Sequence, residues 1–419
     1  MPSDWPLVRL GDMGVAVHDC EHLTPSLGTS GVPYVTIPDM KAGVIDVDGA
    51  KRMPETDYPK WTRRTTPQDG DVVLSRRTNP GVTAVAPAGS RYALGQNLVL
   101  LRSEGKVVDP GFLRWLCRSE PWWREVRRFL NVGAVFDSLR IRDLPEFELP
   151  VPPLSEQLRI AHILGTLDDK IELNRRMSAT LEEMSRAIFK SWFVDFDPVR
   201  AKAEGRDTGL PPHIADLFPD RLVDSEFGPL PEGWTVSPFS HGVEVRSGGT
   251  PKTSVDAYWD GPVPWFSMAD LPATTEAWLV NTAKSLTEAG LASIGASPLP
   301  PVATVLTARG TVGRVALVNV PTVINQSCYG LVSVDGAPFH AYFKTRAVVE
   351  ELRARSHGSV FGTITRATLD SIPWPTPPVE VRRGFDETVR VLMSRMLAAS
   401  SESQMLRGQR DLLLSEVIA

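Results

Sequence analysis

Three side chains near the start of the sequence have the chemistry of metal ligands. His18, Cys20 and His22 lie within five residues of one another, and imidazole and thiolate groups bind zinc. Structural zinc sites take four ligands at characteristic spacings, which differ from this one, and the sequence has no second cluster to complete the set. We therefore predict that the chain holds no metal.

Two other patterns resemble enzyme signatures only in part. Residues 79–81 read Asn-Pro-Gly, which begins like an amino-methyltransferase signature but lacks its second proline and its aromatic residue. Pro38-Asp39 and Glu104-Gly105-Lys106 imitate a nuclease core, but the gap between them is longer than usual. No glycine-rich nucleotide loop follows a predicted strand convincingly, and there is no Walker lysine motif. We therefore predict no catalytic residues.

Other polar side chains have the chemistry to bind DNA. Arg can pair bidentately with guanine, Asn can pair with adenine, and Thr can bond to either base. Lys252 follows a Gly-Gly loop that would let a backbone approach closely, which suits a phosphate contact. Solvated turns are the plain alternative for all of these residues. The predicted DNA-binding residues are Arg76, Arg77, Thr78, Asn79, Lys252, Arg309, Thr311 and Arg314, and Arg124, Arg127 and Arg128 share one side of a predicted helix that would suit phosphates.

The net charge of −5 at first argues against DNA, but its distribution weakens that argument. Residues 1–150 carry 19 basic and 19 acidic side chains, residues 228–372 carry 10 and 11, and residues 151–227 carry 10 and 14. Arg outnumbers Lys 35 to 10, which suits phosphates and guanine but also fits codon bias in a GC-rich genome. Nearly neutral domains would bind DNA weakly alone, so we expect a partner that supplies positive charge.

The composition is that of an ordinary globular protein, with 42% hydrophobic and 23% charged residues. No stretch approaches the roughly 18 apolar residues of a membrane helix. Residues 1–5 lack the features of a secretory signal, and three cysteines give no disulfide framework. We therefore expect a cytoplasmic protein with no membrane contact.

An internal repeat organises the 419 residues. Residues 133–136 (Gly-Ala-Val-Phe) match residues 358–361 (Gly-Ser-Val-Phe) at an offset of 225. Residues 73–81 match residues 305–313 at an offset of 232, through Val-Leu-Ser/Thr, an arginine and a glycine. The changing offset indicates insertions in the first part of each copy, whereas the later part keeps its length.

Each copy continues into a predicted long helix. Ser155 is a suitable N-cap, and Glu156 would complement the helix dipole. Positions three and four apart form a heptad seam, which returns in the second copy at the same offset of 225, with polar interruptions such as Asn174 and Ser178. Each helix of about 38 residues would be about 57 Å long. An ordinary core helix is the alternative, but the equal spacing favours a helix pair whose seam contains Leu164, Leu167, Ile171, Leu181, Ile188, Leu392, Met396, Leu406 and Leu413.

Short apolar runs before helical stretches predict the rest of the fold. Runs such as 71–74, 98–101 and 302–306 have the length and composition of strands, and residues 111–130 and 339–356 are predicted helical stretches. A connector rich in Gly and Pro separates the copies. The predicted fold class is α+β, with two similar domains separated by two long antiparallel helices in a coiled coil and related by a pseudo-twofold repeat. The predicted boundaries are 1–150 for the first domain, 151–197 for the central helix, 198–230 for the connector, 231–375 for the second domain and 376–419 for the C-terminal helix.

These motifs together resemble the specificity (S) subunits of type I restriction–modification systems. The resemblance is carried by Pro-Pro-Leu-Ser-Glu-Gln at 152–157, by Leu-Asp-Asp-Lys-Ile at 167–171 and by Phe-Lys-Ser-Trp-Phe-Val-Asp-Phe-Asp-Pro at 189–198. It continues through Gly-Pro-Leu-Pro-Glu-Gly-Trp at 228–234 and covers nearly the whole chain. Both domain openings also match, at residues 19–25 and 247–251.

The resemblance implies that both domains are target-recognition domains for a bipartite, asymmetric target in double-stranded DNA. It also implies two methyltransferase subunits and two restriction motor-nuclease subunits as partners, with S-adenosylmethionine, ATP and Mg on those partners and no cofactor in this chain. Residues 379–383 (Val-Glu-Val-Arg-Arg) depart from the pattern at the second helix, so the two docking sites need not be equivalent. Alternatives are a coiled-coil scaffold that never touches DNA, and the specificity subunit of a methylation-only or other phage-defence complex.

Overall fold

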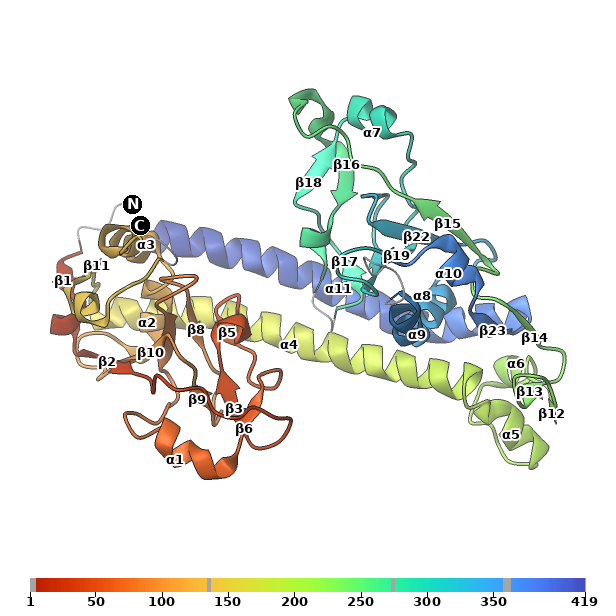
Figure 1. The fold of residues 1–419 in the computed structure, drawn as a ribbon, viewed down its shortest axis with the longest axis horizontal. Helices are drawn as coiled ribbons and strands as arrows, with labels where there is room; N and C mark the ends of the chain where they lie inside the picture. Colours follow the sequence, from red (N-terminus) through yellow and green to blue (C-terminus); the bar gives the residue numbers. More distant parts are fainter. Residues whose placement is uncertain (1–4, 134–136, 273–275, 357–362, 419) are drawn as a thin grey trace. The chain divides into compact units, whose positions relative to one another are not determined.

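The computed structural model describes residues 5–133, 137–272, 276–356 and 363–418 (Figure 1). The chain divides into two compact units: unit 1 contains residues 1–170 and 406–419, and unit 2 contains residues 171–405. Of the repeated tetrapeptides, residues 134–136 and 358–361 lie outside the described residues. Each unit contains one of the two predicted α+β domains.

The first domain is built on a six-stranded mixed sheet with the order β2-β10-β7-β8-β5-β4. A three-stranded sheet, β6-β3-β9, and the pair β1-β11 accompany it. The strands are β1 Leu7–Arg9, β2 Val15–Asp19, β3 Val32–Val35, β4 Met40–Lys41, β5 Val44–Ile45, β6 Arg52–Met53, β7 Val72–Ser75, β8 Thr83–Val85, β9 Ala93–Leu94, β10 Leu98–Ser103 and β11 Glu148–Pro150. The helices are α1 Tyr58–Trp61, α2 Pro110–Leu116 and α3 Glu120–Phe129, with 3-10 turns at Leu10–Met13, Ile37–Asp39, Glu55–Asp57 and Ile141–Glu146.

The predicted strands at 71–74 and 98–101 are the centre of this sheet, as β7 and β10. Because side chains alternate along a strand, Leu74 packs into the cluster that contains Phe112 of α2, whereas Val73 packs on the opposite face with Leu100. Burial on both faces explains the continuous apolar runs Val72–Leu74 of β7 and Leu98–Leu101 of β10. The helical stretch predicted at 111–130 contains two helices, α2 and α3. Pro121 occupies the first turn of α3, where its missing N–H is tolerated.

The second domain has a five-stranded sheet with the order β15-β22-β19-β20-β17, a three-stranded sheet β18-β16-β21 and the pairs β14-β23 and β12-β13. Its strands are β12 Leu222–Val223, β13 Leu230–Pro231, β14 Thr235–Pro238, β15 Val243–Ser247, β16 Trp259–Phe266, β17 Trp278–Leu279, β18 Lys284–Leu286, β19 Thr304–Thr307, β20 Val315–Val318, β21 Val323–Ile324, β22 Cys328–Ser333 and β23 Pro373–Thr376. Unit 2 also contains α5 Asp197–Ala203, α6 Pro212–Ala215, α7 Glu288–Ile294, α8 Pro338–Ala347, α9 Val349–Ser356 and α10 Arg366–Asp370, with 3-10 turns at Asp256–Tyr258 and Met268–Asp270. The predicted helix at 339–356 is therefore two helices, α8 and α9.

The two domains share one topology. Strands β2, β10, β7, β8 and β5 correspond in order to β15, β22, β19, β20 and β17, and the three-stranded sheets correspond as well. The parallel strand pairs also correspond. In the three-stranded sheets they are β3-β9 and β16-β21, and in the larger sheets they are β5-β8 and β17-β20. Even the capping box of the 3-10 turn recurs, with Thr36 and Asp39 in one domain and Ser267 and Asp270 in the other. The predicted pair of similar α+β domains is thus confirmed.

Two long helices, α4 Leu154–Phe193 and α11 Val379–Val417, are each shared between the units. In unit 1, Asp168 of α4 pairs with Arg410 of α11, and Leu164 packs in the same cluster as Leu414. In unit 2, Trp192 stacks edge-on against Phe385 and Asn174 bonds to Ala399. Within each unit, rising residue numbers in α4 meet falling numbers in α11, so the helices run antiparallel as predicted. Helix α4 begins at Leu154, so Ser155 lies in its first turn and is not the N-cap.

Of the nine predicted seam residues, Leu164 and Met396 are buried and the other seven are half-buried. The polar interruptions lie deeper: Asn174, Ser178 and Ser185 are at most 3% exposed. The amide nitrogen of Asn174 donates to Glu402 Oε2 at 2.8 Å, which gives this buried N–H group a partner across the helix pair. Buried polar groups of this kind favour one register of a helix pair over its alternatives. No described helix is both long and apolar enough to cross a membrane.

Candidate nucleic-acid interface

Two equivalent turns carry most of the predicted DNA-binding residues. The first arginine turn (residues 75–82) joins β7 to β8, and the second arginine turn (residues 307–314) joins β19 to β20. Gly81 N–H donates to Ser75 O and Gly313 N–H donates to Thr307 O, both at 2.9 Å. Positive φ values also recur, at Thr78 (65°) in the first turn and at the equivalent Gly310 (73°) in the second. The same backbone therefore presents different side chains in the two domains.

Each arginine turn is bonded to a neighbouring turn that the sequence analysis missed. Arg76 N–H donates to Asn97 O at 3.0 Å, and Ala308 N–H donates to Ser327 O at 2.8 Å. These contacts bring in Gln96, which bonds to the Thr24 hydroxyl, and Gln326, which bonds to the Thr250 hydroxyl; all four members of these pairs are exposed or half-buried. The sequence does contain a signal for these neighbouring turns. Residues 93–98 align with residues 323–328 at an offset of 230, which lies between the offsets of 225 and 232 found for the other parts of the repeat.

In the first domain these groups line an open cleft of about 470 Å³. Thr78 and Asn79 contribute from the arginine turn and Gln96 from its neighbour. The remaining lining residues are Thr36, Ile37, Pro38 and Met40. The cleft therefore combines amide and hydroxyl groups, which can match the hydrogen-bonding edges of bases, with apolar side chains, which can contact a thymine methyl group.

The cations of the two turns differ from most other arginines of the molecule. Arg77 and Arg309 are exposed, and among the described residues their side chains make no hydrogen bond or ion pair. By contrast, Arg91 pairs with Glu55, and Arg102 Nη2 lies 2.6 Å from Asp71 Oδ2. Unpaired, exposed guanidinium groups are free to bind phosphate or guanine. Arg76 is half-buried, and its Nε has no partner in the described structure.

The remaining candidates fall into different environments. Thr311 is exposed, but Arg314 is half-buried, its guanidinium donates to Pro272 O, and burial together with Arg353 lowers its pKa. Lys252 is exposed in its loop, yet a Cβ at Gly248 would lie 1.9 Å from Ile324 O. That glycine is explained by a contact inside the protein, so the argument from a glycine loop no longer supports Lys252 as a phosphate contact. On helix α3, Arg127 and Arg128 form ion pairs with Glu120 and Glu125, and Arg124 is exposed.

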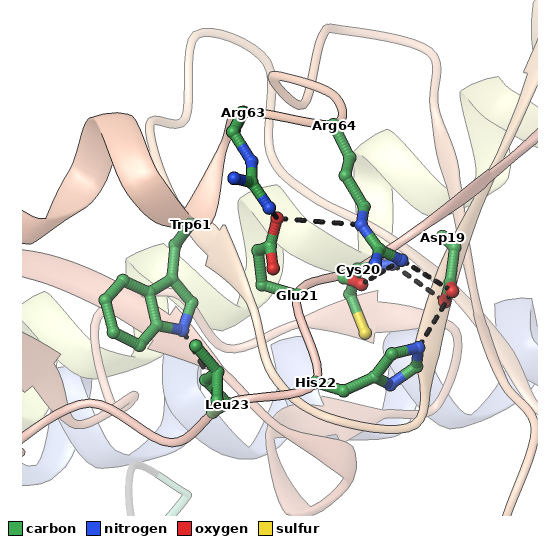
Figure 2. Close-up of polar contacts among 8 residues, drawn as sticks. All are labelled: Asp19, Cys20, Glu21, His22, Leu23, Trp61, Arg63 and Arg64. Atoms are coloured by element: carbon green, nitrogen blue, oxygen red, sulfur yellow. Dashed lines mark hydrogen bonds and ion pairs between the residues drawn. The ribbon is translucent and has the colours of Figure 1, made fainter.

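The metal-like cluster is also held together by protein contacts (Figure 2). Ligand atoms of Asp19, Cys20 and His22 lie within 4.8 Å of one another, whereas the predicted triplet had His18 in place of Asp19. The Asp19 carboxylate accepts from Arg64 at 2.9 Å and contacts His22 Nε2 at 2.8 Å. Burial, followed by the nearby Asp19 charge, raises the pKa of the Cys20 thiol, which favours a protonated sulfur that is a poor ligand. These bonds give the cluster a structural role in its loop.

Comparisons with known proteins agree with this architecture. The family model for the type I restriction modification DNA specificity domain matches residues 2–183 and 231–383. The specificity subunit of the type I restriction enzyme HindI from Haemophilus influenzae is 24% identical over 371 residues, covering 78% of this chain and 80% of that protein. The MjaIX specificity subunit from Methanocaldococcus jannaschii is 29% identical over 427 residues, covering 100% and 93%.

The fold also resembles the crystal structure of the type I restriction–modification S subunit from M. genitalium. The TM-score is 0.59 at 13% identity, over 100% of this chain and 97% of that one. Both halves of the repeat are matched by the same family model, and together they make up most of the sequence. The chain therefore belongs to the family of type I restriction–modification DNA specificity subunits.

Proposed function

We propose that each domain of this chain binds one half of a bipartite, asymmetric target in double-stranded DNA. The observation that carries the proposal is the pair of equivalent arginine turns, each with an exposed arginine that has no partner among the described residues. Their equal backbones favour equivalent docking of both domains on the duplex. The side chains differ at six of the eight positions, and the polar ones include Arg76, Thr78 and Asn79, which are replaced by Ala308, Gly310 and Thr311 in the second turn. Different side chains on equal backbones would recognise different half-sites.

The long helices would set the length of the unrecognised spacer between the half-sites. Helices α4 and α11 have 40 and 39 residues, and each continues from one unit into the other. A helix of 40 residues is about 60 Å long, which exceeds the roughly 34 Å between successive major-groove faces on one side of DNA. Helix length would therefore control spacing, and the arginine turns would control base identity.

The chain itself would catalyse no reaction. Two methyltransferase subunits, with S-adenosylmethionine, would modify adenine, and two restriction motor-nuclease subunits, with ATP and Mg, would cleave. Exposed apolar side chains on the long helices are candidates for the contacts with these partners. In unit 1 these include Leu158 and Leu412, and in unit 2 they include Leu173, Val391 and Met405. The nearly neutral charge of both domains also favours a partner that contributes positive charge to the DNA contact.

Mapping modified bases across the host genome, with and without the gene, tests the proposal directly. We expect one bipartite motif to lose its methylation when the gene is absent. A gel shift with the chain and its methyltransferase partner then separates the alternatives. Selective retention of the mapped motif supports DNA recognition, whereas no selectivity for any duplex supports a scaffold. Methylation without cleavage activity in the purified complex would indicate a methylation-only system.

A further inference from the structure

At equivalent places in the two domains, some polar surface side chains are identical and others differ. Arg77 and Arg309 occupy the same place in the two arginine turns. The pair Thr24–Gln96 of the first domain recurs as Thr250–Gln326 in the second. The groups beside them differ between the domains: Arg76, Thr78 and Asn79 of the first turn are replaced by Ala308, Gly310 and Thr311 in the second.

The Thr–Gln pairs are chemically equivalent. In the first domain the Gln96 amide donates to the threonine hydroxyl, and in the second domain the Thr250 hydroxyl donates to the Gln326 carbonyl oxygen. A hydroxyl can both donate and accept, and an amide can rotate, so either arrangement is open to both pairs. Each pair joins two loops that are distant in sequence, and the other side-chain amide atom of each glutamine has no partner among the described residues, so it can bind a ligand.

We propose that Arg77, Arg309 and both Thr–Gln pairs bind the sugar–phosphate backbone, whereas Asn79 and its counterpart Thr311 bind bases. This inference rests on the proposed function in DNA recognition. Two half-sites of different sequence have the backbone in common, so a group that is identical in both domains suits the backbone. Groups that differ between the domains suit the bases, because they would make the target asymmetric.

The chemistry of each group agrees with this assignment. Arginine, threonine and glutamine side chains all bind phosphate and sugar oxygens in protein–DNA complexes. Asn79 lines the cleft of about 470 Å³ and has the amide that can pair with both N6 and N7 of adenine. Thr311 cannot form that bidentate pair. The half-site bound by the first domain would therefore contain a base pair whose identity depends on Asn79.

Variants of the full chain, in complex with its methyltransferase partner, test the assignment. The probes are a duplex that carries the mapped target and a duplex of equal length without it, each titrated at several salt concentrations. Arg77→Ala and Arg309→Ala should each weaken binding of both duplexes by a similar factor of about ten and reduce the slope of log K against log[salt] by about 1. Arg77→Lys should retain most of the affinity, because lysine still binds phosphate as a point charge but lacks the planar guanidinium that pairs with guanine.

Neutral variants complete the comparison. Gln96→Ala and Gln326→Ala should weaken binding of both duplexes by roughly threefold to tenfold, with an unchanged salt slope and an unchanged methylation motif. Asn79→Ala should change the motif in one half only. Arg221→Ala is the matched control, because Arg221 lies exposed in the connector and pairs with Glu232. It removes one positive charge and should leave affinity and motif unaltered.

The possible outcomes separate the two proposals. If the unaltered complex binds both duplexes equally, the proposed function fails and this inference fails with it. If the unaltered complex is selective but Arg77→Ala or Gln96→Ala changes the motif, these groups bind bases and the inference alone is wrong. It is also wrong if those variants bind as well as Arg221→Ala does, or if Asn79→Ala leaves both halves of the motif unchanged.

Discussion

Asp168 forms a buried ionic cluster in unit 1, and replacing it should destabilise that unit strongly. Its carboxylate pairs with Arg410 of α11 at 2.6 Å and with Arg114 of α2. The side chains of Asp168 and Arg410 are only 12% and 9% exposed. Asp168→Ala would leave two arginines without their shared carboxylate in a site that water barely reaches. Breaking a buried pair costs about 3–5 kcal/mol, and we expect about 3 kcal/mol here because Arg114 is partly solvated.

Differential scanning calorimetry measures this effect as the midpoint of the unit 1 transition. For a unit of this size, about 3 kcal/mol corresponds to a decrease in Tm of about 6–12 °C. Arg159→Ala is the control on the same helix: Arg159 Nε lies 2.9 Å from Glu156 Oε2 in an exposed pair, whose loss should cost less than about 1 kcal/mol. Hydrogen exchange should show faster opening at the C-terminal end of α11 in Asp168→Ala only.

A second variant separates the loss of pairing from the loss of packing. Replacing Arg114, Asp168 and Arg410 with apolar residues (Arg114→Met, Asp168→Leu and Arg410→Met) leaves no unpaired charge in the buried site. Only the exposed Asp411, whose side chain is 60% accessible, loses its partner Arg410, so the variant should restore most of the lost stability. The prediction is refuted if Asp168→Ala unfolds within about 2 °C of Arg159→Ala, since the carboxylate would then contribute no more than a surface group.

Three further predictions follow from the fold. Burial, followed by the charge of Arg382, lowers the pKa of Lys344 to about 7. Above that pH the unfolded chain therefore binds more protons than the folded chain. The stability of unit 2 should consequently rise from pH 7 toward pH 10. Lys344→Met should remove this rise in urea titrations at pH 7 and 9.5; a rise of equal size in both proteins would contradict the assignment. Thr78→Gly should stabilise unit 1 by about 1 kcal/mol because Thr78 has a positive φ, and Gly310→Thr should destabilise unit 2; opposite signs in thermal unfolding would show that strain is not the cause. Exchanging residues 1–150 for the first domain of another family member should change one half of the methylated motif, and a change in both halves would contradict independent domains.

The long helices and the repeat could be predicted because their signals are periodic and local. The heptad spacing recurs at a constant offset of 225 without a gap, and the apolar runs at 71–74 and 98–101 have the length of buried strands. Strand pairing could not be predicted from the sequence. Strand β2 pairs with β10, which is distant along the chain, and the short parallel pairs have no local sequence signature. Where the predicted helices divide was also missed, although Pro121 marked one division.

The candidate site was only partly predictable for the same reason. Arg77 and Asn79 were found because they follow a recognisable strand. Gln96 was missed because its turn meets the arginine turn only through tertiary bonds, and insertions shift its offset to 230. The glycine loop before Lys252 was misinterpreted because a sequence shows that a close approach is needed but not which atom approaches. In this chain the approaching atom is Ile324 O.

Unit 1 is built from two segments that are distant in the sequence, and this affects how the protein forms during synthesis. The C-terminal segment 406–419 belongs to the same unit as the first domain, and Leu414 and Ile418 are buried in the cluster that contains Leu10 and Phe112. Domains usually fold in the order in which they leave the ribosome. Here the first domain lacks part of its core until Leu414 and Ile418 have been synthesised, more than 200 residues later. Removing residues 406–418 would therefore expose apolar surface on the first domain.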